Sequence, residues 1–210
     1  MQHHKIIIVG IGTNVGKTVA AAIITHALQA TYFKPIQCGF TNGTDAQWVQ
    51  QHTNCKVLNE TFLLSLPASP HLAAQAESVV INIDPITTTI NNYRQNLVIE
   101  GAGGIMVPIN NTETFLNALA IWNLPTIIIS RNYLGSINHS LLTALALKHN
   151  NINKCAWLFN DDFMGYEADI STITNLPSLG KIPNCNNINR KFITAQALIL
   201  KPALLQWLNN

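Results

Sequence analysis

Short runs of apolar residues alternate along the chain with stretches in which apolar residues recur at helical spacing. This alternation is typical of a parallel sheet whose strands are connected by crossover helices. Strands are predicted at residues 5–9, 31–36, 96–99, 125–130, 154–159 and 179–182. Helices are predicted at residues 17–29, 112–122, 136–149 and 193–208. We therefore expect an α/β fold with a mostly parallel central sheet, helices on both faces, and a single domain over residues 1–210.

Proline positions refine this picture at several helix ends. Asp84-Pro85 resembles an N-cap followed by proline at the first helical position, and Ser69-Pro70 suggests a turn or a helix entry. A loop enters a short helix within residues 42–53, and Pro202 is expected to break or kink the last helix. Residues 55–80 carry no clear periodicity otherwise, so no strand is predicted there.

Composition narrows the class of protein. Hydrophobic residues make up 48% of the 210 residues, which supports a buried core and argues against disorder. Charged residues make up only 10% and the net charge is +2, so no basic surface points to nucleic acid. The four cysteines form no C-x-x-C pair and are expected to be reduced thiols. Without an apolar run long enough for a leader or a membrane span, we expect a cytoplasmic protein.

The strongest chemical signal is a glycine-rich loop between the first strand and the first helix. It reads Gly10-Ile11-Gly12-Thr13-Asn14-Val15-Gly16-Lys17-Thr18. Backbone N–H groups of such a loop bind phosphate, Lys17 reaches the β- and γ-phosphates, and the Thr18 hydroxyl binds Mg²⁺. The usual spacing would place the first glycine at Ile11, so this P-loop is a longer variant.

Three further polar residues occupy strand ends or the loops that follow them. Glu100 ends a predicted strand before Gly101, where side chains point into the ligand crevice of an open sheet. It is a candidate metal ligand. Lys34 either neutralises an anion or lies on the surface. Asp45 either caps a helix or provides a second carboxylate for Mg²⁺. Cys38 is either a nucleophile or a small side chain packed beside the site.

The chain resembles the dethiobiotin synthetase family through blocks that span nearly its whole length. Besides the P-loop these are Tyr32-Phe33-Lys34-Pro35-Ile36-Gln37-Cys38-Gly39, Asp45, Ser69-Pro70-His71, Glu100-Gly101-Ala102-Gly103-Gly104 and Leu134-Gly135-Ser136-Ile137-Asn138-His139. A weaker block is Phe159-Asn160-Asp161, followed by Gly180-Lys181-Ile182-Pro183. The P-loop alone is shared by many families, whereas the combination is specific.

The resemblance implies a reaction and a set of residues for it. The family joins CO₂ to 7,8-diaminononanoate with ATP and Mg²⁺ as a homodimer, closing a ureido ring through a carbamate and a mixed anhydride. By position, Lys17 and Lys34 would be catalytic. The remaining implied residues are, for ATP, Gly12, Thr13, Asn14, Val15, Gly16, Lys17, Thr18, Asn160 and Pro183; for Mg²⁺, Thr18, Asp45 and Glu100; for the diamine, Lys34 and Cys38; and for its carboxylate across the dimer interface, Gly135, Ser136, Ile137 and Asn138.

Some positions depart from common family members. Ile11 and Gly12 replace frequent Thr and Asp, Asn14 replaces an acidic residue, and Cys38 replaces a hydroxyl residue. The P-loop also leaves two other functional classes open. A related amide ligase would need a glutaminase domain, for which 210 residues leave no room. A nucleotide switch of the partition-ATPase type usually has a second lysine early in its P-loop, where this chain has Ile11 and Gly12.

Overall fold

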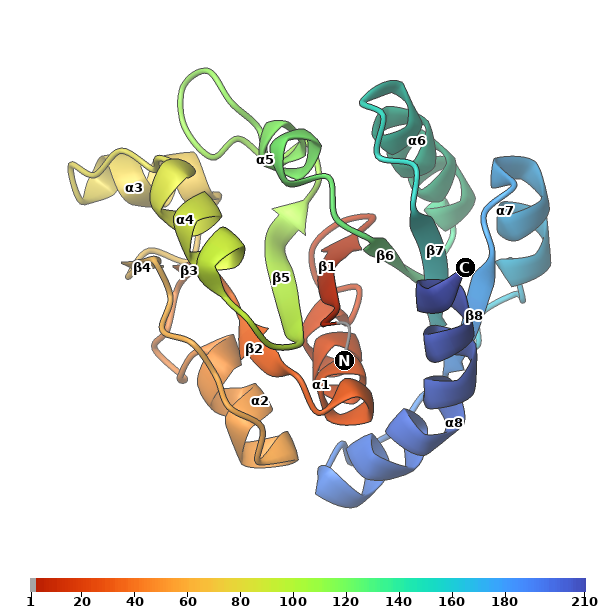
Figure 1. Cartoon of the computed structure of the whole chain (residues 1–210). Helices are drawn as coiled ribbons and strands as arrows, with labels where there is room; N and C mark the ends of the chain where they lie inside the picture. The colour runs from red at the N-terminus through yellow and green to blue at the C-terminus, as the bar shows by residue number, and fades with distance from the viewer. Residues whose placement is uncertain (1–2) are drawn as a thin grey trace.

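The computed structural model describes residues 3–210 and places six of their strands in one parallel sheet (Figure 1). These strands are β1 (Lys5–Gly10), β2 (Thr31–Phe33), β5 (Leu97–Gly104), β6 (Thr126–Arg131), β7 (Cys155–Asn160) and β8 (Ser178–Ile182). Their spatial order is β2-β5-β1-β6-β7-β8, and every neighbouring pair is parallel. The predicted α/β class with a mostly parallel sheet is confirmed.

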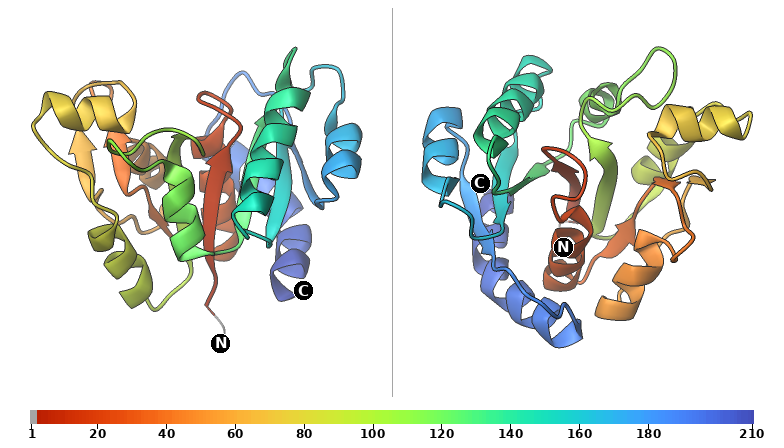
Figure 2. Two further views of the ribbon diagram at one scale, coloured as in Figure 1. Left: turned by 90° about the horizontal axis from the view of Figure 1, so that it is seen from above. Right: turned by 180° about the vertical axis from the view of Figure 1, so that it is seen from behind.

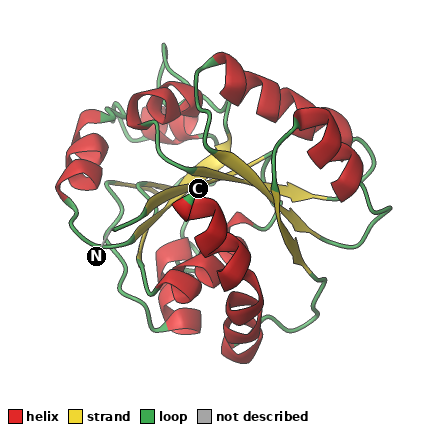
Figure 3. Ribbon diagram, turned by 45° about the vertical axis from the view of Figure 1, so that its right-hand side comes forward, coloured by secondary structure: helices red, strands yellow, loops and turns green. Residues whose placement is uncertain are grey.

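Helices cover both faces of this sheet (Figure 3). They are α1 (Lys17–Leu28), α2 (Asp45–Thr53), α3 (Pro70–Ala76), α4 (Asp84–Asn92), α5 (Phe115–Trp122), α6 (Ser136–His149), α7 (Glu167–Thr174) and α8 (Arg190–Asn209). On one face α1 packs against α2 and α8, and on the other lie α5, α6 and α7 (Figure 2). A sheet buried on both faces requires apolar side chains on both sides of each strand, which accounts for the continuous apolar runs.

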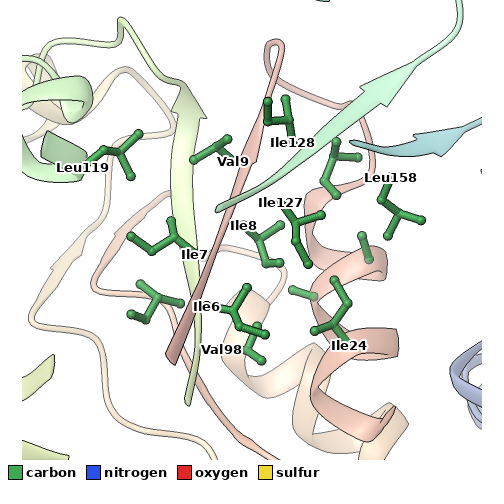
Figure 4. Close-up of a cluster of buried hydrophobic side chains, with 14 of the residues drawn as sticks. Ile6, Ile7, Ile8, Val9, Ile24, Val98, Leu119, Ile127, Ile128 and Leu158 are labelled. Atoms are coloured by element: carbon green, nitrogen blue, oxygen red, sulfur yellow. The ribbon is translucent and has the colours of Figure 1, made fainter. Parts of the chain in front are cut away.

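A cluster of buried apolar side chains surrounds β1, which lies between β5 and β6 (Figure 4). Ile6, Ile7 and Ile8 are fully buried, and Val9 is 1% exposed. Ile24 of α1 is fully buried in the same cluster of side chains. Because β1 leads directly into the glycine-rich loop, this packing also fixes where that loop begins.

The predicted strand at residues 31–36 is wrong in one respect, because the chain divides it into two strands. β2 ends at Phe33, and β3 (Ile36–Cys38) pairs instead with β4 (Phe62–Leu64) in a separate two-stranded sheet. Proline has no N–H to donate to a ladder, and Pro35 lies at the division. Its carbonyl accepts hydrogen bonds from the backbone N–H groups of Thr61 and Phe62, so β4 begins where β3 needs a partner.

Several other boundaries differ from the prediction. β5 continues to Gly104 rather than ending at Glu100, because Gly104 pairs with Gly10 of β1. α5 begins at Phe115 because Thr114 forms a capping box with Asn117. α7 was not predicted at all.

Two expectations about helix ends and breaks are also corrected. The N-cap of α4 is Ile83, so Asp84 is the first residue of the helix rather than its cap. α8 continues through Pro202 as one helix, so the expected break is absent, although its ribbon changes direction part-way along its length (Figure 1). Leu200 and Leu204, on either side of that proline, are both buried, and their packing holds the two halves of the helix in place.

None of the helices within residues 3–210 combines the length and the apolar character that a membrane crossing requires.

The packing predicts a large difference between two identical substitutions in helices. Ile24→Ala should lower the free energy of unfolding by about 2–5 kcal/mol, because it leaves a cavity under β1. Ile199→Ala in α8 is the control, since Ile199 is 70% exposed. Urea denaturation measures both; equal losses would contradict the assignment of Ile24 to the core.

Candidate active site

The glycine-rich loop joins β1 to α1 and depends on two of its glycines. A Cβ on Gly10 would lie 2.6 Å from Cγ2 of Val15. Gly16 has a φ of 91°, and a Cβ there would lie 2.3 Å from Nδ2 of Asn160. A Cβ on Gly12 would meet nothing within 4 Å. The loop is therefore tightly packed at both ends and open at Gly12.

Ile11, the first loop residue after β1, is hydrogen-bonded to the neighbouring strand β6. The backbone N–H of Ile11 donates to the carbonyl of Ile129 in β6 over 3.1 Å, and the Ile11 side chain is only 9% exposed. Ile11 thus continues the strand pairing by one residue, which explains how an apolar residue occupies the position where the common motif has glycine.

Lys17 begins α1 and folds its side chain over the loop. Its Nζ donates to the carbonyl of Gly12 over 2.7 Å, and the residue is 7% exposed. Burial lowers the pKa of Lys17 to about 8, while the nearby Glu100 carboxylate acts in the opposite direction. A cation held in this way, with much of its hydration removed, interacts strongly with an anion brought to the loop.

Glu100 is the most deeply buried carboxylate of the site, with 1% of the residue exposed. Its Oε1 accepts hydrogen bonds from Oγ1 of Thr18 over 3.0 Å and from Nζ of Lys34 over 3.2 Å. Its Oε2 accepts a hydrogen bond from the hydroxyl of Tyr32 over 2.8 Å. A buried charge is tolerated only when it is paired and hydrogen-bonded, and these three donors meet that requirement.

Lys34 connects the two carboxylates of the site. Its Nζ forms ion pairs with both Asp45 and Glu100. Burial alone would lower the pKa of Lys34, but the two carboxylates outweigh that effect and leave its pKa raised. Lys34 is therefore a fully charged cation inside the protein rather than a surface lysine.

Asp45 is held at the first turn of α2. Thr44 caps this helix by a capping box with Gln47, so Asp45 is not the cap. Its backbone N–H donates to Oε1 of Gln37 over 3.3 Å, and its carboxylate is 29% exposed. The helix-cap alternative is thus excluded, and the Asp45 carboxylate is directed at Lys34, while its role as a ligand of Mg²⁺ stays a prediction.

These residues surround a cavity of about 920 Å³. Nine of the predicted site residues line it, namely Thr13, Asn14, Gly16, Lys17, Thr18, Lys34, Cys38, Asp45 and Glu100. Burial raises the pKa of the Cys38 thiol, so it is protonated at neutral pH, which does not suit a nucleophile. Gly12 and Val15 belong to the same loop, and Val15 packs in the core.

The donor set fits a hard divalent cation. Thr18, Asp45 and Glu100 provide a hydroxyl and two carboxylates within one hydrogen-bonded group around Lys34. Among residues 3–210, no cluster of three or more His, Cys, Asp or Glu side chains is arranged to hold a metal. One hydroxyl and two carboxylates suit Mg²⁺, which usually takes one or two protein carboxylates and completes its shell with water and substrate phosphates.

Asn160 and Pro183 lie at the carboxyl ends of β7 and β8. Asn160 donates from Nδ2 to the carbonyl of Val15 over 3.0 Å, so it contacts the end of the phosphate loop directly. It pairs with Ile182 in the sheet, which places the exposed Pro183 one residue further along the same edge. Neither residue lines the cavity.

Residues 135–138 form the start of α6 and are not brought to the cavity of their own chain. Gly135 is the N-cap with a φ of 101°, a conformation that favours glycine. Gly135 and Asn138 are exposed, whereas Ser136 is fully buried and its Oγ accepts from the backbone N–H of Tyr133 over 3.3 Å.

Comparisons with known proteins decide the family. The chain is 39% identical over 91% of its length to the ATP-dependent dethiobiotin synthetase BioD of Rhodopseudomonas palustris (strain BisB18), 92% of which is covered. It is also 39% identical over 85% of its length to the BioD of Agrobacterium fabrum, again with 85% covered. The chain belongs to the ATP-dependent dethiobiotin synthetase family.

Broader comparisons with a family model and with solved structures concern the fold of the chain. A family model described as an AAA domain matches residues 4–191. A plasmid partition protein of Borrelia burgdorferi bound to AMPPNP has a TM-score of 0.64 at 11% identity, covering 98% of this chain and 99% of that one. The MinC:MinD complex of Aquifex aeolicus gives a TM-score of 0.57 at 13% identity, covering 99% and 96%. Such low identities establish the P-loop fold alone.

The sequence does not predict two residues that contact the site. Gln37 positions the start of α2, and Tyr32 contacts Glu100. A signal for Tyr32 was present, because residues two apart in an extended chain point to the same side and Tyr32 precedes Lys34 by two. No comparable signal pointed to Gln37.

The buried ion pairs of Lys34 predict that its replacement lowers the free energy of unfolding far more than replacement of an exposed lysine does. Lys34→Met should lower the free energy of unfolding by about 3–5 kcal/mol, because it leaves Glu100 charged and buried without its cation. Lys34→Met/Glu100→Gln should recover part of that loss. Lys181→Met is the control, since Lys181 is 40% exposed and makes surface ion pairs. Guanidinium denaturation of the four proteins measures this, and a double variant no more stable than Lys34→Met would contradict it.

Proposed function

We propose that this chain converts 7,8-diaminononanoate, CO₂ and ATP into dethiobiotin, ADP and phosphate, with Mg²⁺. The observation that carries the proposal is family membership over nine-tenths of the chain together with one cavity that gathers Lys17, Lys34, Thr18, Asp45 and Glu100. At about 920 Å³ the cavity lies at the upper end of the roughly 300–1,000 Å³ common for ligand sites, which suits two substrates side by side.

The first chemical step forms an anion next to another anion. One amine of the substrate attacks the carbon of CO₂, and a C–N bond forms as one C=O π bond opens. The nitrogen then releases a proton, and the product is an anionic carbamate. This carbamate must approach the γ-phosphate of ATP, and the two negative charges repel each other. Lys34 lies between Asp45 and Glu100 on the cavity wall as a buried, fully charged cation, so it is placed to offset that repulsion.

The next two steps transfer the phosphoryl group and close the ring. A carbamate oxygen attacks the γ-phosphorus, the bond to the ADP oxygen breaks, and a carbamic-phosphoric anhydride results. The second amine then attacks the carbamoyl carbon, the C–O bond to phosphate breaks, and the ureido ring closes with release of phosphate and a proton. Residues 12–17 hold the phosphates through backbone N–H groups, and Lys17 stabilises charge on the transferred group.

Thr18, Asp45 and Glu100 would hold Mg²⁺, which supplies positive charge to the phosphates when bound. Asn160 would contact the adenine, and Pro183 would border it. Cys38 and Lys34 line the wall where the diamine is expected, and a thiol there gives a weaker hydrogen bond than a hydroxyl residue would. All four cysteines are free, in keeping with a cytoplasmic location.

The distant carboxylate of the substrate calls for a second copy of the chain. Residues 135–138 lie at the positive, N-terminal end of the α6 dipole, where the N–H of Ser136 already donates to the carbonyl of Tyr133, and they do not line the cavity of their own chain. Their exposure at Gly135 and Asn138 supports an active site completed by the partner in a homodimer.

The decisive experiment supplies the purified protein with the diamine, labelled bicarbonate, ATP and Mg²⁺ and identifies the product by mass spectrometry. Dethiobiotin carrying one labelled carbon is expected. ATP hydrolysis should also require the diamine. Hydrolysis that proceeds equally without the diamine, with no labelled product, would instead favour a nucleotide switch and overturn the proposal.

Lys17→Ala should lower the rate of product formation by about 10²-fold or more, because it removes a cation that contacts the transferred phosphoryl group. Lys201→Ala is the matched control, since Lys201 is exposed on α8. Circular dichroism establishes that both variants fold. Near-normal turnover by folded Lys17→Ala would refute its role.

Complementation tests the shared site. Lys17→Ala and Gly135→Glu, each inactive alone, are mixed under conditions of proven subunit exchange. With random pairing in a twofold dimer, half of the dimers are mixed and each has one intact site, so about a quarter of the wild-type activity should return. If exchange is complete and nothing returns, residues 135–138 act within their own chain.

A further inference from the structure

Tyr32 is a fully buried polar residue that takes no part in the proposed chemical steps. It belongs to β2, its exposed fraction is 0%, and its hydroxyl donates to Oε2 of Glu100 over 2.8 Å. It does not line the cavity, although Glu100 does. The hydroxyl therefore reaches the carboxylate from within the protein rather than from the side of the substrates.

The two oxygens of Glu100 have different surroundings. Oε1 is bonded to Thr18 and Lys34, and both of those residues line the cavity. Oε2 is bonded to Tyr32. Because the Tyr32 hydroxyl holds Oε2, the Glu100 carboxylate cannot rotate about its Cγ–Cδ bond without breaking that hydrogen bond. Its other oxygen thus keeps one direction, towards the phosphate loop.

Tyr32 is itself held rigidly, which an orienting group requires. Its backbone N–H donates to the carbonyl of Lys56 over 2.9 Å, and its carbonyl accepts from the N–H of Leu58 over 2.8 Å. On its other side it is paired with Val98 of β5, two residues before Glu100. Donor and acceptor are therefore carried by adjacent strands of one sheet.

We propose that Tyr32 is a positioning residue that orients Glu100 for the nucleotide-bound Mg²⁺, with Oε1 directed at the metal. The inference rests on the proposed function, in which Glu100 is a metal ligand. Its physical basis is that hydrogen bonds to a ligating carboxylate set its direction, so that losing one typically weakens metal binding by about 10–100-fold. A neutral hydroxyl also does this without cancelling the charge that attracts the metal.

The test compares Tyr32→Phe with Tyr93→Phe. Both remove one hydroxyl, and Tyr93 is a matched control because its hydroxyl donates to Oγ1 of Thr31, away from the carboxylates. Mn²⁺ binding is measured by electron paramagnetic resonance with a non-hydrolysable ATP analogue. Tyr32→Phe should weaken Mn²⁺ binding by about 10–100-fold and raise the Mg²⁺ concentration for half-maximal rate in proportion. Tyr93→Phe should match the wild type.

Two readouts separate orientation from a merely structural role. Metal-free binding of the analogue and the rate at saturating Mg²⁺ should both stay close to the wild-type values in Tyr32→Phe. In a Glu100→Gln background, adding Tyr32→Phe should no longer change Mn²⁺ affinity, because the orienting contact acts only through the carboxylate. Unchanged Mn²⁺ affinity in Tyr32→Phe, or an equal loss in the Glu100→Gln background, would overturn the inference.

A second measurement, by nuclear magnetic resonance, uses protein in which Tyr32 is unchanged. With tyrosine labelled at the phenol carbon, the Tyr32 resonance should move when Mg²⁺ and the analogue are added together, while that of Tyr93 stays in place. Assignment uses variants of the other three tyrosines. A stationary Tyr32 signal would count against the inference even if Tyr32→Phe failed to fold. Wild-type protein that binds no metal with nucleotide would instead refute the proposed function itself.

Discussion

The burial of the Glu100 carboxylate is the constraint on which the site depends. A charge that is almost completely removed from water must be compensated by donors, and the fold brings these from separate segments: Thr18 from α1, Tyr32 from β2 and Lys34 from the chain beyond it. Lys34 then requires Asp45 as a second partner. One buried anion therefore ties the phosphate loop, the β2 edge and the start of α2 into a single charged group.

The parallel sheet makes this convergence possible. β1 lies between β5 and β6, so the loop that follows it is flanked by the carboxyl ends of both neighbours. Ile11 pairs with β6, and Gly104 of β5 pairs with Gly10. Because ligands of open α/β sheets bind beyond the carboxyl ends of the strands, this arrangement puts phosphate-binding N–H groups and buried carboxylates at one edge.

The same fold serves proteins whose sequences differ widely from that of this chain. The partition and MinD proteins share the architecture at 11–13% identity, whereas the dethiobiotin synthetases match this chain at 39%. Only 10% of the residues are charged, and four of them, Lys17, Lys34, Asp45 and Glu100, line one cavity. Fold and activity are thus carried by different parts of the sequence.

The sequence by itself determined the glycine-rich loop, the buried strands around it and the strand-end residues Lys34 and Glu100, because each depends on local spacing and periodicity. Only the tertiary structure decided that β3 leaves the main sheet to pair with β4, and that Tyr32 binds Glu100 across 68 positions of sequence. Contacts between distant segments arise from which strands become neighbours. No periodicity within one segment records that choice, and the burial that selects a hydrogen-bond partner exists only once the strands have packed.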